Sequence, residues 1–487
     1  MINKNQFFSL FFLLLISFTG STQESSPEPN ILFIAIDDLN DWVGVLGGND
    51  QVLTPNIDEL ASRGITFTNA HAPSSLCNPS RTAIFSGLAP SSTGVYLNNP
   101  DWRTLDIFNN APTIPKHLKD NGYKTMGAGK LFHASTYNPR AFQGFNDTTA
   151  WNTYYPSIDR QLHDEVAPIN RPSNQTPMSR FFDWHRMTTE DEASGDGQVI
   201  THSVENILNM DDSSNFIGVG IYRPHLPWYN NSKYFDLYPL DQIKLPLVND
   251  SDLDDVSAVG RLIHKYPLLE AATGAFDGMA LHEWIRQSGE NTYREAVQGY
   301  LASISFADAM VGRLIDALDE SGKAEDTIII LWSDHGWHLG EKLRWRKSTI
   351  WEESTRVPLI IVAPGITKAG TKTDKVVSLM DLYPTLLDII GWDIPNHLEG
   401  RSLRPLIEDQ MTGWDHFALS TYGYKNHAIR DDRYRYIRYS DGSEELYDHD
   451  IDPNEWNNLA SNQSYFEVKS RLASFLPEED MPDQLKR

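Results

Sequence analysis

Segments that predict buried strands alternate with helical segments along the chain, and this alternation limits the possible folds more than any other feature. The predicted strands are Asn30 to Ile36, Ile65 to Phe67, Phe216 to Ile221 and Thr327 to Trp332. The longest predicted helix, Glu295 to Asp319, repeats apolar residues at helical spacing. Such alternation is typical of a parallel sheet flanked by helices, so we expect an α/β fold built on a large, mostly parallel sheet.

Length and composition set further limits. A chain of 487 residues exceeds a typical single domain, which favours one large domain and a smaller one. A hydrophobic content of 40% is ample for a core and excludes global disorder. The net charge of −25 excludes nucleic acid as a partner and implies that any anionic substrate meets a local basic pocket.

The N-terminus has the pattern of a secretory signal. Lys4 precedes an apolar run from Phe7 to Phe18, and small polar residues follow from Thr19 to Thr22. We therefore predict a signal peptide over residues 1–22 and export to a bacterial periplasm or the cell exterior. After its removal we expect no membrane association. The single cysteine, which cannot form an internal disulfide, fits a bacterial exported protein.

That cysteine, Cys77, stands just before a predicted short helix from Pro79 to Phe85. Unpaired backbone N–H groups at a helix N-terminus favour anions, and Arg81 adds a positive charge. The site should therefore lower the thiol pKa or hold an oxyanion such as sulfate or phosphate. The alternative is a small buried cysteine near a turn.

Polar residues gather where the predicted strands end. Asp37 and Asp38 follow the first strand, Asp334 and His335 the last, and His225 the central one. Ligands of such sheets bind beyond the carboxyl ends of the strands, although acidic pairs there are also common as turn residues. Converging carboxylates repel one another unless a cation lies among them, and calcium is the natural candidate. Imidazole is an unusual calcium ligand, which makes His335 the weakest member of this set. Magnesium and manganese stay open as well.

Basic residues form the complementary set. The glycine-rich turn from Gly127 to His133 carries Lys130 and His133, and His225 and Lys347 lie further along the chain. Each alone is best explained as a solvated or capping residue. Together they match a known set of catalytic residues.

Four motifs carry a resemblance to a family. Cys77 to Arg81, followed by Ser86-Gly87, matches the Cys-x-Pro-Ser-Arg maturation signature of type I sulfatases. Lys130 to His133 is one residue longer than the usual motif, and Ser333 to Trp337 has histidine where many sulfatases have asparagine. Both departures are typical of the iduronate-2-sulfatase-like branch of the alkaline-phosphatase superfamily, which the chain resembles. The similar stretches are Ile31 to Asp38, Cys77 to Gly87, Thr113 to His133, Tyr222 to Pro227 and Val311 to Pro364.

The resemblance implies a domain arrangement. A catalytic sulfatase domain is expected over residues 23–400, and a smaller C-terminal α+β subdomain with an antiparallel sheet over 401–487. The segments Tyr434 to Ile437 and Glu445 to Asp448 resemble strands of that sheet. We expect a monomer by default.

The resemblance also implies the chemistry. A formylglycine-generating maturation enzyme would oxidise Cys77 to formylglycine, whose hydrated form attacks the sulfur of a sulfate ester and is oriented by Arg81. Lys130 would hold the sulfuryl oxygens, His225 and Lys347 would assist the departing alcohol, and His133 would act as the base in release of the sulfate. The implied ligands of one Ca²⁺ ion are Asp37, Asp38, residue 77, Asp334 and His335.

The substrate is the least defined part. The branch suggests a sulfated polysaccharide or its oligosaccharides, either algal (ulvan or fucoidan) or a glycosaminoglycan. Trp337, Trp102 and Arg103 are candidates for sugar stacking and anion contacts, although core tryptophans and a surface arginine explain them equally well. Three alternatives stay open: a phosphoesterase of the same superfamily, a cysteine hydrolase that pairs Cys77 with His133 or His225, and a non-catalytic carbohydrate-binding protein.

Overall fold

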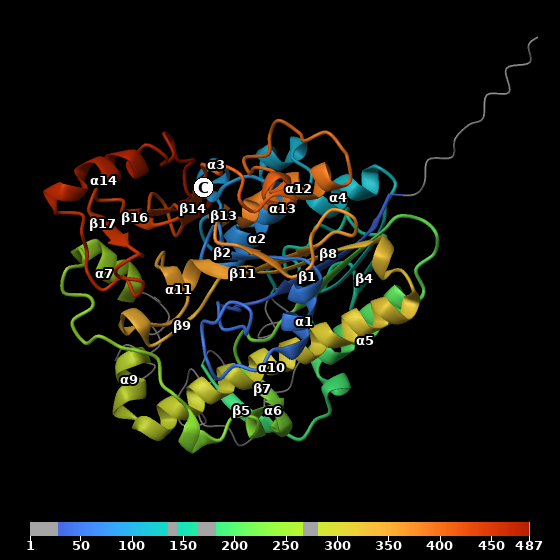
Figure 1. The fold of residues 1–487 in the computed structure, drawn as a ribbon, viewed down its shortest axis with the longest axis horizontal. Coiled ribbons are helices and arrows are strands. Elements are labelled where there is room, and N and C mark those ends of the chain that lie inside the picture. The colour runs from blue at the N-terminus through green and yellow to red at the C-terminus, as the bar shows by residue number, and fades with distance from the viewer. Residues whose placement is uncertain (1–27, 135–143, 163–181, 266–280, 487) are drawn as a thin grey trace, which may run out of the picture.

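The computed structural model describes residues 28–134, 144–162, 182–265 and 281–486, and a nine-stranded sheet lies at its centre (Figure 1). The strand order is β12-β2-β11-β8-β1-β6-β3-β4, with β13 also paired to β2. The strands are β1 (Asn30–Ile36), β2 (Ile65–His71), β3 (Lys124–Gly129), β4 (Thr153–Tyr155), β6 (Asn215–Ile221), β8 (Thr327–Ser333), β11 (Arg356–Val362), β12 (Thr371–Thr373) and β13 (Val377–Ser378).

The predicted mostly parallel sheet is confirmed. Strand β1 pairs in parallel with β8 on one side and β6 on the other, and only β11 is antiparallel to its neighbours β2 and β8. Both faces of β1 are covered, which explains its continuous apolar run. Its side chains alternate between two cores: Leu32 and Ile34 face one, and Ile31 and Phe33 face the other.

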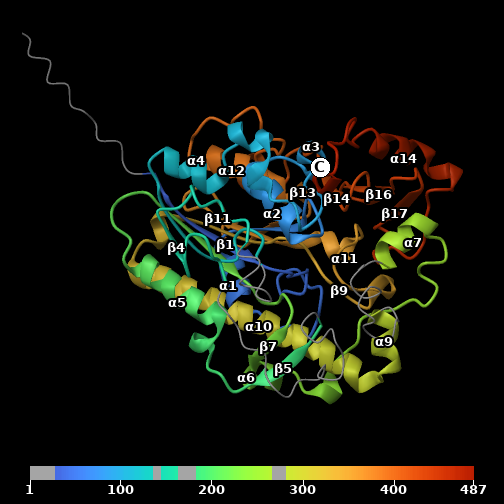
Figure 2. The ribbon, with the colours of Figure 1, turned by 180° about the vertical axis from the view of Figure 1, so that it is seen from behind.

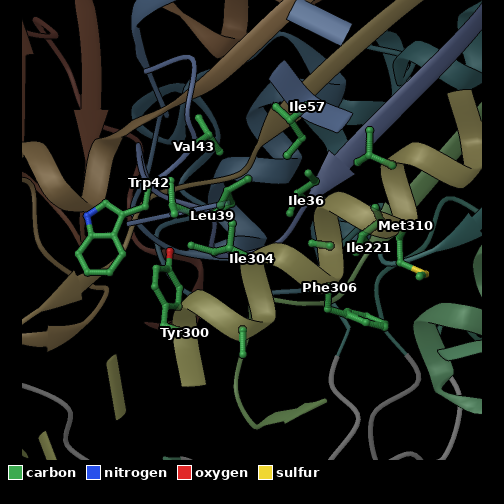
Figure 3. Close-up of a cluster of buried hydrophobic side chains, with 14 of the residues drawn as sticks. Ile36, Leu39, Trp42, Val43, Ile57, Ile221, Tyr300, Ile304, Phe306 and Met310 are labelled. Carbon is green, nitrogen blue, oxygen red and sulfur yellow. The ribbon is translucent and has the colours of Figure 1, made fainter. Parts of the chain in front are cut away.

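Helices cover the two faces of the sheet (Figures 1 and 2). One face packs against α1 (Pro55–Arg63), α5 (Gly195–Leu208) and α10 (Glu290–Ser321). The other packs against α2 (Cys77–Ser86), α4 (Ile114–Asp120), α12 (Leu382–Ile389) and α13 (Arg404–Glu408). Figure 3 shows the first core, where side chains of α10 meet the end of β1 and the segment that follows it.

The long helix α10 begins five residues earlier than its apolar repeat predicts, and Gly322, at a φ of 70°, ends it as predicted. The start of α1 is capped by another element. Thr54 is the N-cap residue, but its hydroxyl accepts the Gly44 amide at 2.8 Å, donates to Asp58 Oδ1 at 3.5 Å and bonds no backbone amide of the helix. Asp308 of α10 instead accepts the Ile57 amide at 2.8 Å and the Asn56 amide at 3.3 Å.

The predicted C-terminal antiparallel sheet is confirmed as well. It contains β14 (Ala418–Thr421), β15 (His427–Arg430), β16 (Tyr434–Arg438) and β17 (Glu444–Asp448) in sequence order, and α14 (Phe466–Ala473) packs on it. The residues Leu403 and Leu406 pack in the core of the large sheet, and a domain boundary near Gly400 stays a prediction.

Shorter elements complete the described chain. They are α3 (Pro90–Thr93), β5 (Trp184–Met187), β7 (Trp228–Asn231), α6 (Ser232–Asp236), α7 (Ala258–Lys265), α9 (Leu281–Gln287), β9 (His338–Leu339), β10 (Trp345–Arg346) and α11 (Glu352–Thr355). Within the described ranges, no helix has the length and apolar character needed to span a bilayer. The predicted signal peptide, residues 1–22, lies outside those ranges.

Candidate active site

The carboxyl ends of β1 and β8 bring the predicted acidic residues together. Asp37 and Asp38 directly follow β1, and Asp334 and His335 follow β8. The amide of Asp38 donates to Asp334 Oδ1 at 3.1 Å, which joins the two strand ends. All four side chains are buried, so three carboxyl groups and one imidazole lie together inside the protein at this edge of the sheet.

Cys77 is the first residue of α2, as expected for a sulfur at a helix N-terminus, and it is fully buried. Its Sγ lies 3.1 Å from Lys347 Nζ, 3.4 Å from His335 Nε2 and 3.8 Å from Lys130 Nζ. Burial, with a contribution from Asp37, raises the pKa of the thiol to about 12 although the two lysines oppose the rise. The predicted lowering of the thiol pKa is therefore wrong, because removal of the thiolate from water costs more than the nearby charges return.

Arg81 connects several parts of the site. Its Nε donates to Asp334 Oδ2 at 2.8 Å, and Nη2 to Asp37 Oδ1 at 3.1 Å. Its Nη1 donates to the carbonyls of Lys130 and, at 2.8 Å, Leu131. One buried guanidinium thus fixes both acidic strand ends and the turn after β3 in relation to α2.

The turn after β3 requires a glycine. Gly129 has a φ of 69°, and a Cβ there would lie 2.1 Å from the carbonyl oxygen of Gly220. The turn directs the ammonium of Lys130 onto Asp37, with which it forms a buried ion pair. Burial opposes ionisation, but Lys130 and Arg81 hold the pKa of Asp37 well below its usual value.

Several donor atoms converge as in a metal site. Asp37, Asp38, Cys77 and His335 each offer one ligand atom, and these atoms lie within 4.8 Å of one another. Asp334 is not in this group, and its Oδ2 accepts from Arg81.

Two atoms of the group fit a cation. Asp38 Oδ2 is buried without a hydrogen-bond partner, and burial raises the pKa of Asp38 to about 7 although Lys347 opposes the rise. His335 Nδ1 must donate to the Gly336 carbonyl at 3.1 Å, so Nε2 of the neutral ring presents a lone pair, 3.4 Å from Asp38 Oδ1. A hard divalent cation matches the carboxylate oxygens that Asp37 and Asp38 contribute to this group.

The remaining predicted catalytic residues surround the same point. Lys347 Nζ donates to Asp38 Oδ1 at 2.5 Å. His225 Nε2 lies 3.9 Å from Asp38 Oδ2, and its side chain is 17% exposed at the rim. His133, half-buried, follows the Lys130 turn. Burial, with the charges of Lys130 and Lys347, lowers the pKa of both histidines well below 6.5, which keeps them neutral.

Two of the predicted substrate contacts are wrong. Trp337 is 1% exposed and packs against Tyr300 and Trp228, so no ring face is open to a sugar. Trp102 is 5% exposed, and its Nε1 donates to the Phe145 carbonyl at 3.0 Å. Arg103 is exposed and pairs with Asp101, so its contact with a substrate stays a prediction.

The sequence did not single out three hydroxyl groups that contact the site. Ser80 Oγ donates to the Asp334 carbonyl at 2.6 Å, Ser333 Oγ accepts the Leu39 amide at 3.0 Å, and Tyr300 Oη donates to the Asp38 carbonyl at 2.8 Å. Ser80 and Ser333 lie inside the recognised motifs, which is a usable signal. Tyr300 is an aromatic residue within the apolar pattern of a long helix, and nothing in the sequence relates it to Asp38.

Comparison with known proteins agrees with this geometry. The family model described as Sulfatase matches residues 29–392, and the model of the C-terminal region of N-sulphoglucosamine sulphohydrolase matches residues 340–481. A sulfatase of Formosa agariphila is 37% identical over 93% of this chain and 87% of its own length. The iduronate 2-sulfatase of Homo sapiens is 29% identical over 78% of this chain and 72% of its own length.

Solved structures share the fold. A protein in complex with its substrate D-glucosamine-2-N,6-O-disulfate has a TM-score of 0.68 at 21% identity, over 92% of this chain and 96% of its own. The phosphonate monoester hydrolase of Agrobacterium radiobacter has a TM-score of 0.72 at 22% identity, over 92% and 94%. Because the Sulfatase model covers most of the chain and the Formosa relative nearly all of it, the chain belongs to the sulfatase family, as a type I sulfatase of the alkaline-phosphatase superfamily that hydrolyses sulfate esters.

Proposed function

We propose that this sulfatase removes sulfate from a sulfated carbohydrate outside the cytoplasm, with formylglycine made from Cys77 as its nucleophile and one calcium ion in the acidic cluster. The observation that carries the proposal is the position of residue 77. Residue 77 is the first residue of α2. Its side chain lies among two lysine ammonium groups, a histidine and the other possible metal ligands. A nucleophile, anion-binding cations and a cation site therefore meet at one buried point.

The aldehyde at position 77 and the calcium ion, which the chain would have to acquire, would each supply different chemistry. A hydrated aldehyde at position 77 would supply an oxygen nucleophile and a second hydroxyl for turnover. Calcium held by Asp37, Asp38, His335 and residue 77 would supply positive charge for the sulfuryl oxygens. The unpartnered Oδ2 of Asp38 supports the cation.

The protein's own residues bind and orient the sulfate. Lys130 and Lys347 lie 3.8 and 3.1 Å from the Cys77 sulfur, where charge-assisted hydrogen bonds reach the oxygens of a sulfate group. Four of the five N–H groups of Arg81 donate to carboxylates and carbonyls and its side chain is fully buried, so we assign it to orienting the site.

Lys347 is the better proton donor to the departing alcohol. An ammonium always carries hydrogens, whereas His225 Nδ1 donates to the Leu226 carbonyl at 2.7 Å and leaves Nε2 of the neutral ring with a lone pair. His225, at the rim, can accept a hydrogen bond from a substrate hydroxyl. His133, neutral and half-buried beside Lys130, is the proposed base in release of the sulfate.

The names of the relatives support the substrate class. Iduronate 2-sulfatase is a curated relative, and a neighbour in fold is solved with a disulfated glucosamine. We assign a sulfated polysaccharide or its oligosaccharides, algal or glycosaminoglycan. Because the protein carries a net charge of −25, recognition of such polyanions must depend on the buried lysines and not on the overall field.

The test is a screen of purified protein, expressed with a formylglycine-generating enzyme, on defined sulfated oligosaccharides with free sulfate as the readout. Peptide mass spectrometry determines the state of residue 77 in the same sample. Sulfate release together with the aldehyde is the expected result. Activity with an unaltered cysteine, or preferential hydrolysis of phosphate monoesters, would contradict the proposal.

Metal and location are tested separately. Dialysis against EDTA should abolish turnover, and calcium should restore it better than magnesium or manganese. Recovery of the mature chain in the periplasm or medium of the native host, with its N-terminus shortly after Thr19, is expected from the predicted signal. A full-length cytoplasmic protein would disprove export.

A further inference from the structure

Asp38 holds its carboxylate in the cation site from an unfavourable backbone conformation. Its φ is 62°, in the left-handed region that non-glycine residues rarely adopt. Such a conformation persists only where the surrounding structure imposes it. Because Oδ2 of Asp38 has no hydrogen-bond partner, its direction depends on this backbone and on Lys347 at Oδ1.

A tyrosine from the opposite side of the core contacts that backbone directly. Tyr300 Oη donates to the Asp38 carbonyl at 2.8 Å and accepts the Asn40 amide at 3.1 Å. Figure 3 shows Tyr300 extending from α10 toward the segment that carries Leu39 and Trp42. Burial raises the pKa of Tyr300 well above 10, so the phenol keeps the hydrogen that it donates.

The ring of Tyr300 is fixed by tryptophans. Its centroid lies 5.7 Å from that of Trp42, 5.6 Å from Trp228 and 6.3 Å from Trp337. Since all three tryptophans are buried, the hydroxyl has little freedom to leave the Asp38 carbonyl. The packing of Trp337 on this ring is the role that the structure gives to a residue expected to stack on sugars.

A second hydroxyl acts on the next residue. Ser333 Oγ accepts the Leu39 amide at 3.0 Å and donates to the His335 carbonyl at 3.0 Å. It therefore joins the segment after β1 to the segment after β8, and both segments carry residues of the possible metal group. Together the two hydroxyls bond both polar groups of the Asp38–Leu39 peptide, its carbonyl and its amide.

We propose that the hydroxyls of Tyr300 and Ser333 are positioning groups for the cation site, which hold the Asp38 backbone so that its carboxylate faces the metal. The inference rests on the cation of the proposed function. Both hydroxyls bond backbone groups, so neither is assigned as a metal ligand. Partners of this kind, which orient the ligands, commonly change metal affinity by about 10- to 100-fold when they are removed.

The experiment compares full-length Tyr300→Phe and Ser333→Ala with the wild type. Tyr383→Phe is the matched control, because Tyr383 is also fully buried and its hydroxyl bonds the Pro112 carbonyl at 3.1 Å and His117 Nδ1 at 2.8 Å, among the helices on the other face. Melting temperatures are measured in EDTA and over a calcium series, since ligand binding to the folded state raises Tm with concentration. This readout does not depend on activity.

We expect both hydroxyl variants to need about tenfold more calcium than the wild type for the same rise in Tm. Tyr383→Phe should keep the wild-type calcium response, whatever stability it loses in EDTA. Should Tyr300→Phe fail to fold, Ser333→Ala still decides the matter.

Two contrary results are distinguishable. If the wild type shows no response to calcium, magnesium or manganese, the proposed cation fails and this inference fails with it. If the wild type responds and the folded hydroxyl variants respond at the same concentrations, the cation stands and only the positioning role is overturned. A variant that loses equal stability in EDTA and in calcium also overturns the positioning role alone.

Discussion

At the scale of single residues, the proposed chemistry depends on Cys77 and on the two lysines beside it. A thiol with its pKa raised to about 12 stays protonated at neutral pH and is a poor nucleophile. The chain belongs to the sulfatase family, so the cysteine-hydrolase alternative loses its support.

Cys77→Ala should abolish sulfate release and leave the fold intact, because the side chain supplies the nucleophile and is small. Free sulfate measures the first effect, and circular dichroism with thermal unfolding measures the second. Retained turnover in a folded Ala variant would remove residue 77 from the mechanism.

Lys347→Ala should reduce kcat/KM on a sugar sulfate about 100-fold more than on a nitrophenyl sulfate, since only the poor leaving group needs a proton. His225→Ala should lower activity on the sugar with a smaller difference between the substrates. Steady-state kinetics on both substrates provide the comparison. Equal losses for Lys347→Ala on the two would refute its role as the acid.

At the scale of elements, apolar runs were enough to predict β1, β6 and β8, because strands buried on both faces consist of continuous apolar residues. The reversed direction of β11 could not be predicted, since a run such as Arg356–Val362 contains no signal for its partner's direction. The same limit applies to α1, whose N-terminal amides are bonded by a residue 251 positions away.

Asp308→Ala should lower the free energy of unfolding by about 1–3 kcal/mol, because it leaves the amides of Asn56 and Ile57 without their acceptor. Urea unfolding measures the loss. Asp316→Ala, an exposed position on the same helix, is the control and should change stability little. A similar loss in both variants would show that the capping contact contributes nothing specific.

The sequence predicted the candidate site about as far as it predicted the strands and helices. The acidic strand ends and the basic set were found because each follows a recognisable strand or motif, and the structure brings them together. Side-chain direction was not predictable. Trp337 lies next to the motif in sequence yet turns into the core, and Tyr300 reaches Asp38 across 262 positions.

At the scale of the whole molecule, buried ion pairs join the C-terminal sheet to the segment after Lys347. Arg435 of β16 is fully buried and pairs with Glu352 and, at 2.6 Å, with Glu455. Its Nη1 also donates to the Ile350 carbonyl at 3.0 Å. The C-terminal unit therefore contacts the segment that follows Lys347, the proposed proton donor.

Arg435→Met should destabilise the protein by about 3–5 kcal/mol, because Glu352 and the buried Glu455 lose the fully buried cation between them and keep only Arg430 and His449 as ion-pair partners within the described chain. Guanidinium unfolding at neutral pH measures this loss. Arg433→Met, which breaks a pair at an exposed arginine in the turn before β16, is the control and should cost much less. Comparable losses would mean that burial of the Arg435 pairs adds nothing.

The complete burial of Cys77 has a consequence for the order of events in the cell. In the folded protein no catalytic surface can approach a side chain with 0% exposure at the base of α2. An enzyme that makes the proposed formylglycine would therefore have to act while this stretch of chain is still unfolded. A chain that folds first would remain permanently unconverted, so the yield of active protein would depend on the rate of Cys77 oxidation relative to the rate of folding.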